Sequence, residues 1–79
     1  MLTLSEELTK LGRAEAHVLE ASRRIESQRA LVTSMAAKSG ERVRAETLLS
    51  TMQATLNQFT FHRDAILENI ERLRRKHTE

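Results

Sequence analysis

Apolar residues return every seven positions along the first half of the chain, at Leu4, Leu11, Val18, Ile25 and Val32. The second half continues with alternating steps of four and three residues. That series is Ala45, Leu49, Met52, Leu56, Phe59, Arg63, Ile66, Ile70 and Leu73. Heptads of this kind are typical of long helices that pack along one apolar seam. The pattern therefore predicts an all-α fold, an antiparallel two-helix coiled-coil hairpin.

Ser39-Gly40 is the one place in the predicted hairpin where the chain has a clear signal to turn. Gly40 is expected to adopt the left-handed conformation that often ends a helix. Thr3 followed by Glu6 fits a capping box at the start of the first helix, whereas Val43 stands where a serine or threonine would cap the second helix better. We predict a single domain, residues 1–79, with a helix over about 4–38, a turn over about 39–41 and a helix over about 42–76. The helical propensity on both sides of Gly40 also leaves open a swapped dimer in which each chain forms one continuous rod.

A turn at Ser39-Gly40 places residues whose numbers add to about 80 opposite each other, given the regular rise of a helix. Large side chains then meet small ones: Phe59 lies against Ala21, and Ile66 against Ala14. Such volume matching is what close packing requires. The usual alternation of core positions in antiparallel coiled coils favours sums of about 77 or 84, so the register stays open by about half a turn.

Gln28 and Arg63 occupy seam positions that are normally apolar. Polar groups in a seam penalise misaligned pairings, so we interpret both as residues that fix the register. Arg63 can also extend towards solvent, with Glu15 or Glu20 as its carboxylate partner.

His17 and His62 fall beside the seam on the same flank, and Glu20 lies one turn from His17. Two histidines and a carboxylate are a ligand set that zinc or iron accepts. Helical metal sites usually repeat a Glu-x-x-His spacing, which this chain lacks. A hydrogen-bonded polar clasp between the helices is therefore the favoured reading, with no metal and no cofactor, and a metal-binding hairpin is an alternative.

The sequence contains no catalytic constellation, no glycine-rich phosphate loop and no cysteine. A two-helix hairpin also offers no pocket that would exclude water from a small-molecule substrate. No apolar run reaches the roughly 18 residues that a membrane span requires. We expect a non-catalytic, cytoplasmic protein.

Residues 47–61 contain no charged side chain, although 30% of the chain is charged. A lone hairpin buries one stripe of each helix, so apolar residues beside the seam would stay exposed unless two hairpins paired into a four-helix bundle. The expected partner is a second copy or another helical protein, and Phe61→Glu is expected to weaken the association. The predicted interface residues are Leu48, Thr55, Phe61 and Leu67.

The end of the second helix carries the main basic cluster, Arg72, Arg74, Arg75 and Lys76. These charges complement the negative end of a helix dipole, and the formal net charge of the chain is only +2. A small nucleic-acid-associated protein is thus an alternative function rather than the favoured one. Four pairs spaced by four residues should form ion pairs along the helices: Glu6/Lys10, Glu20/Arg24, Glu68/Arg72 and Glu71/Arg75.

Several short motifs resemble those of small uncharacterised bacterial helical-hairpin proteins. The matching stretches are His17-Val18, Arg24-Ile25, Gln28-Arg29, Gly40, Leu48-Leu49 and His62-Arg63-Asp64. The similarity spans roughly residues 13–73, and Val43 departs from it because the family has a capping threonine or serine after the glycine turn. The resemblance implies a helical hairpin with polar seam residues and implies no biochemical activity.

Overall fold

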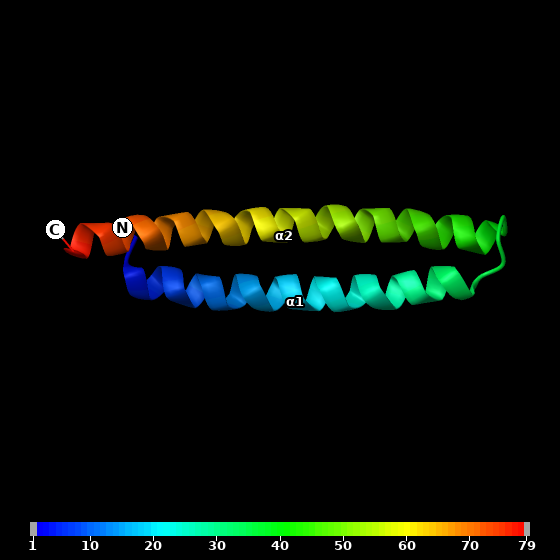
Figure 1. Cartoon of the computed structure of the whole chain (residues 1–79), viewed down its shortest axis with the longest axis horizontal. Helices are drawn as coiled ribbons and strands as arrows, with labels where there is room; N and C mark the ends of the chain where they lie inside the picture. The colour runs from blue at the N-terminus through cyan, green and yellow to red at the C-terminus, as the bar shows by residue number, and fades with distance from the viewer. Residues whose placement is uncertain (1, 79) are drawn as a thin grey trace.

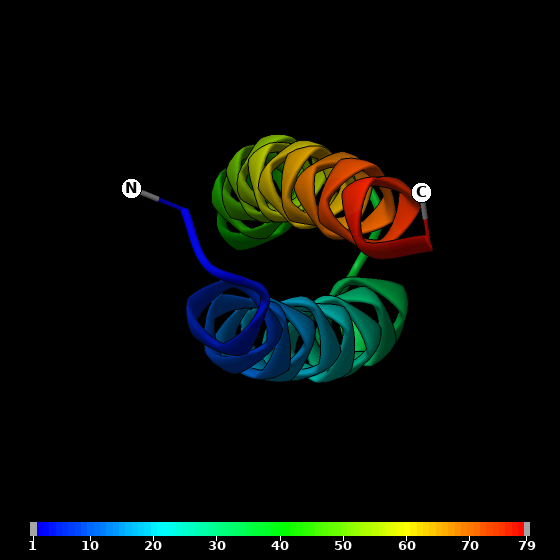
Figure 2. The same cartoon turned by 90° about the vertical axis from the view of Figure 1, so that its left-hand side faces the viewer.

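A computed structural model describes residues 2–78, with side chains as far as Lys76, and shows an antiparallel helical hairpin. Helix α1 covers Leu4–Ser34 and helix α2 covers Gly40–Thr78. The two helices lie side by side along the whole length of α1 (Figure 1), in a molecule that measures 60 × 17 × 14 Å. Viewed from the end, the two helices slant in opposite directions, so they are not strictly antiparallel (Figure 2). The all-α hairpin predicted from the heptads is confirmed.

The predicted seam positions of both helices are buried or half-buried. At the open end of the hairpin, Ala14 packs with Ile66 and Ile70, and Leu4 and Leu11 cover this cluster. The pairing of Ile66 with Ala14 therefore follows the predicted matching of large and small side chains. Full burial of an isoleucine contributes about 1.5–3 kcal/mol, so this cluster is a main source of stability.

The middle of α2 is covered less well than its two ends. Ala45 and Ile66 are buried, but the four apolar seam residues between them are only half-buried. These residues are Leu49, Met52, Leu56 and Phe59. The hairpin thus leaves the centre of its own seam partly open to solvent.

The first helix ends earlier than predicted, and glycine does not make the turn. Helix α1 stops at Ser34 rather than near Lys38, because Met35 already has extended backbone angles (φ −84°, ψ 149°). Lys38, with φ 66°, takes the left-handed conformation predicted for Gly40. Gly40 has no positive φ and is instead the first residue of α2.

Two side-chain contacts explain this turn. The Ser39 hydroxyl accepts a hydrogen bond from the Arg42 amide at 3.1 Å, so Ser39 caps α2 and the cap sought at Val43 is not needed. The Arg42 guanidinium donates to the Met35 carbonyl at 3.2 Å and ties the end of α1 to the start of α2. At the other end of α1, Thr3 accepts from the Glu6 amide at 3.1 Å, as the capping motif predicts.

Two hydrogen bonds between the helices join residues whose numbers add to less than 80, although Ala14 and Ile66, whose numbers add to 80, pack in one cluster. Glu7 contacts Asn69 rather than a residue near Leu73, and the Gln28 side chain contacts the backbone of Ala45. The numbers of Glu7 and Asn69 add to 76, close to the sum of about 77 that the sequence left open beside 80. The C-terminal end of α2 consequently projects past the start of α1 (Figure 1).

Candidate protein-interaction surface

Three threonines form a ridge along the uncharged part of α2. Thr47, Thr51 and Thr55 donate their hydroxyl protons to the backbone carbonyls four residues earlier, at 3.0, 3.2 and 3.1 Å. A spacing of four residues places them in one row on the helix surface. Because these protons are used inside the helix, the ridge offers few donors to water and its methyl groups are available for contact with another protein. The ridge is therefore less polar than its composition suggests.

A hollow of about 280 Å³ lies between the helices beside this ridge, with Thr51, Thr55 and Met52 on its α2 side. Ala21 lines it from α1, where a larger side chain would fill the space. The Phe59 ring contacts the His17 ring, with 5.4 Å between the ring centres, and both rings border the hollow. Phe59 and Ala21 therefore lie at the same level of the hairpin, as predicted, because both line this hollow. Their side chains do not fill the space between the helices.

We call the face formed by Leu48, Thr51, Met52, Thr55 and Phe59 the threonine flank. Their spacings of three and four residues place them on one side of α2. Leu48 is 51% exposed at one end of the flank, and Phe59 is half-buried at the other. The flank therefore combines exposed apolar groups, internally bonded threonines and an adjacent hollow, and it carries no charge.

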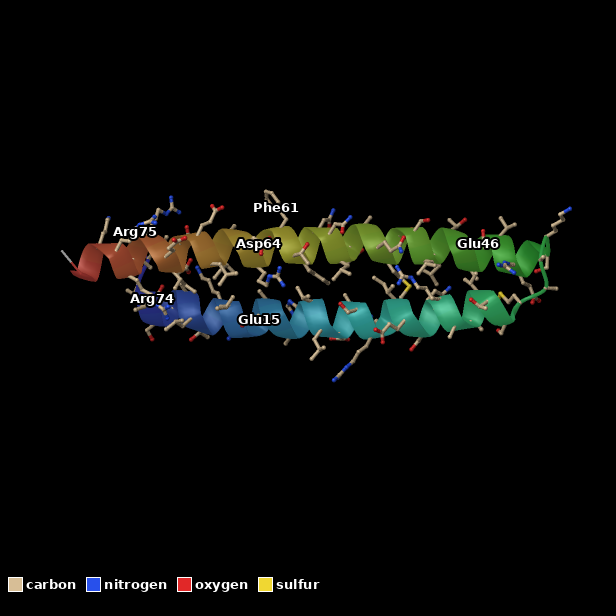
Figure 3. The ribbon with its side chains drawn as sticks, viewed as in Figure 1. Glu15, Glu46, Phe61, Asp64, Arg74 and Arg75 are labelled. Atoms are coloured by element: carbon tan, nitrogen blue, oxygen red, sulfur yellow. The ribbon has the colours of Figure 1, made fainter. Side chains whose placement is uncertain are left out.

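The four predicted interface residues do not share one face. Leu48 and Thr55, seven residues apart, both belong to the threonine flank. Leu67 lies on the opposite flank of α2, where it lines a groove with Ile70 and Arg74. Phe61 is 79% exposed and points away from α1 (Figure 3). The absence of charge is a property of the segment, whereas a contact surface depends on the side of the helix on which each residue lies.

The two polar seam residues behave differently from each other. Gln28 is buried, and its amide nitrogen donates to the Ala45 carbonyl at 2.9 Å, a contact that fits the predicted role in fixing the register. Arg63 pairs with the adjacent Asp64 at 3.0 Å. The prediction that Glu15 or Glu20 binds Arg63 is wrong, because a neighbouring carboxylate is closer and Glu20 instead pairs with Arg24 at 2.8 Å.

His17, Glu20 and His62 do not assemble into one site. All three side chains are exposed, and His17 contacts Phe59. No hydrogen bond within residues 2–78 joins the two histidines, so the predicted clasp is wrong. In the same part of the chain, no three histidine, aspartate or glutamate side chains lie close enough to hold a metal ion. His17 and Glu20 instead line the hollow between the helices, where the His17 ring contacts the Phe59 ring.

Glu7 is the polar residue whose importance the sequence analysis missed. Its side chain is 1% exposed, accepts a hydrogen bond from the Asn69 amide at 2.8 Å and lies 2.9 Å from the Lys10 ammonium. The bonds from Lys10 and then Asn69 stabilise the carboxylate and lower the pKa of Glu7 below its ordinary value of 4.5. The signal was present, because Glu7 occupies a heptad position between Leu4 and Leu11.

The side chains of Arg72, Arg74, Arg75 and Lys76 are exposed near the C-terminal end of α2. Arg72 donates to the Asn69 side chain, and Arg75 lies 3.3 Å from Glu71. Of the four predicted ion pairs, Glu20/Arg24 and Glu71/Arg75 form, while Lys10 pairs with Glu7 instead of Glu6. The projecting end therefore combines basic side chains with acidic and amide partners rather than presenting a continuous cationic face.

Neither α1 nor the described part of α2 is long and apolar enough to cross a membrane. No protein-family model matches this chain, and no curated protein or solved structure matches it either.

Proposed function

We propose that this chain is a non-catalytic helical interaction module that works by self-association, with two hairpins pairing into a four-helix bundle. The observation that supports it is the coincidence of two features on α2. The charge-free residues 47–61 overlap the stretch in which the apolar seam is only half-buried. A cytoplasmic location remains part of the proposal.

The energetic argument concerns the apolar area that a second hairpin would remove from water. Leu49, Met52, Leu56 and Phe59 are only half-buried in the single chain. Each Å² of apolar surface that becomes buried contributes about 25 cal/mol. Charged side chains would oppose such burial, because their desolvation costs several kcal/mol each unless they are well paired. The charge-free stretch of α2 keeps that cost low on its side of the seam, and on the α1 side Glu20 and Arg24 form an ion pair at 2.8 Å.

The available surface is large enough for a stable contact. The chain exposes 6145 Å² in total, and a standard protein interface needs about 800 Å² from each partner, or about one eighth of this surface. A molecule 60 Å long and 17 Å wide can supply that area along one side.

Sedimentation equilibrium across micromolar concentrations tests the proposal. The expected result is a molar mass close to twice the 9.0 kDa of one chain, with high helicity in circular dichroism. A mass of 9.0 kDa at every concentration would overturn self-association. In that case the expected partner would be a different helical protein.

A further inference from the structure

We infer that the dimer forms when the threonine flank of α2 packs antiparallel against the same flank of a second copy, across a two-fold axis near residue 53. The inference rests on the proposed self-association and names the surface and the arrangement that would produce it. Three observations support this particular face: its lack of charge, its ridge of back-bonded threonines and the hollow beside it.

The lack of charge favours a second copy over an unrelated partner. In a two-fold dimer the same patch is used by both chains, so residues near the axis lie close to their own counterparts. A charged residue there would face a like charge, which is unfavourable in a site that excludes water. Residues 47–61 form the longest charge-free stretch of the chain, and they are centred close to residue 54. This is the part of α2 that can be placed against itself without like-charge contacts. Beside it, Glu20 and Arg24 of α1 line the hollow and pair with each other at 2.8 Å.

The shape of the flank also suits a helix-to-helix contact. Rows of side chains spaced by four residues form the ridges that pack into the grooves of a neighbouring helix. The ridge of Thr47, Thr51 and Thr55 is such a row, and its last two members belong to the flank. Threonine is small enough for helix axes to approach to about 8–10 Å. Since the three hydroxyls already donate to backbone carbonyls, burying them leaves no donor without a partner.

The hollow receives a side chain in this arrangement. An axis near residue 53 places Leu48 of one copy opposite Phe59 of the other copy. Leu48, which is 51% exposed in the single chain, then reaches the space bordered by Ala21 and Phe59. The same axis sets Met52 opposite Thr55. Each exposed apolar group of the flank thus meets a recess or a small residue, as close packing requires.

Opposite charges at one flank position test the arrangement. Thr55→Glu and Thr55→Lys chains, examined separately by sedimentation equilibrium, are each expected to have a mass near 9.0 kDa, because each places two like charges beside the axis. An equimolar mixture of the two is expected to recover about twice that mass as a heterodimer. Helicity should stay at the wild-type level throughout, since Thr55 is exposed.

Thr33→Glu is the matched control. Thr33 is also exposed, and its hydroxyl donates to the carbonyl of Arg29 four residues earlier, at 2.9 Å, but it lies on α1. The control is expected to remain a dimer. If Thr55 variants lose helicity, Leu48→Glu at another exposed position of the flank replaces them, with the same expected loss of dimer mass.

The outcomes separate the two proposals. A monomeric wild-type chain would overturn self-association itself. A dimeric wild type whose Thr55→Glu variant stays as dimeric as Thr33→Glu would overturn the threonine flank and leave self-association intact. Two monomeric Thr55 variants that fail to dimerise when mixed would overturn the two-fold antiparallel arrangement.

Discussion

At the scale of single residues, the carboxylate of Glu7 ties the two helices together at the open end of the hairpin. It joins Lys10 of its own helix to Asn69 of α2. Both contacts favour the charged form, which lowers the pKa of Glu7 below 4.5 in the folded chain. In the unfolded chain this carboxyl binds a proton more readily, so folding stability depends on pH through Glu7.

The sign follows from a folded-state pKa that is lower than the unfolded one. The stabilising contribution of Glu7 is fully present above the unfolded value of 4.5 and is lost as the pH falls through the lower folded value. We expect the free energy of unfolding, measured with urea and circular dichroism, to decrease on acidification in this range. Glu7→Gln should lower stability above pH 4.5 and should show a smaller decrease below it.

Glu26→Gln is the control for this experiment, because Glu26 is an exposed carboxylate on the same helix. It should keep the pH dependence of the wild type. If the free energy of unfolding depended on pH equally in the Glu7→Gln and wild-type chains, Glu7 would not be a source of the pH dependence of stability.

At the scale of secondary-structure elements, the turn between α1 and α2 places a lysine, rather than a glycine, in the left-handed conformation. Lys38 has φ 66°, a conformation that costs a residue with a Cβ about 1 kcal/mol or more. Gly40 lies in α2 without a positive φ, and an added Cβ would meet no atom within 4 Å. We therefore expect Lys38→Gly and Gly40→Ala each to raise the free energy of unfolding by about 0.5–1 kcal/mol.

Urea unfolding of the two variants, followed by circular dichroism, measures both effects. Ala37→Gly in the same turn is the control, and it should lower stability because Ala37 has no positive φ and glycine adds entropy to the unfolded chain. A destabilised Gly40→Ala chain would instead support the role that the sequence pattern indicates for Gly40.

The heptads were sufficient to predict the elements and the seam, because the burial of apolar residues follows helical period. They were not sufficient to predict the turn. Its position depends on Ser39, which caps α2 through a local contact, and on Arg42 reaching back to Met35, a contact that exists only once both helices are in place. The four residues predicted for the candidate surface do not lie on one face of α2. Thr47, Thr51 and Thr55 recur every four residues in the sequence, but the hollow beside them depends on how Phe59 and His17 pack.

At the scale of the whole molecule, the arrangement of two hairpins sets the length of the proposed dimer. A two-fold axis near residue 53 lies close to the middle of α2, so the two 60 Å hairpins overlap over most of their length. At 1.5 Å per residue the paired molecule should be about 75 Å long. A swapped dimer with each chain as one continuous helix over residues 4–78 would be about 110 Å long. The non-helical backbone at Met35 and the left-handed Lys38 both favour the shorter form.

Small-angle X-ray scattering of the dimer distinguishes these two forms. We expect a maximum dimension near the shorter value, because opening the turn would sacrifice the Ser39 cap, the Arg42 contact with Met35 and the contact between Glu7 and Asn69 within one chain. Lys38→Ala is a second test of what decides the length, because alanine keeps the Cβ and favours helix at the turn. If length were decided by helical propensity alone, that variant and the wild type would both extend to about 110 Å. If the turn contacts decide it, both should keep the compact length, since Lys38→Ala removes none of those contacts.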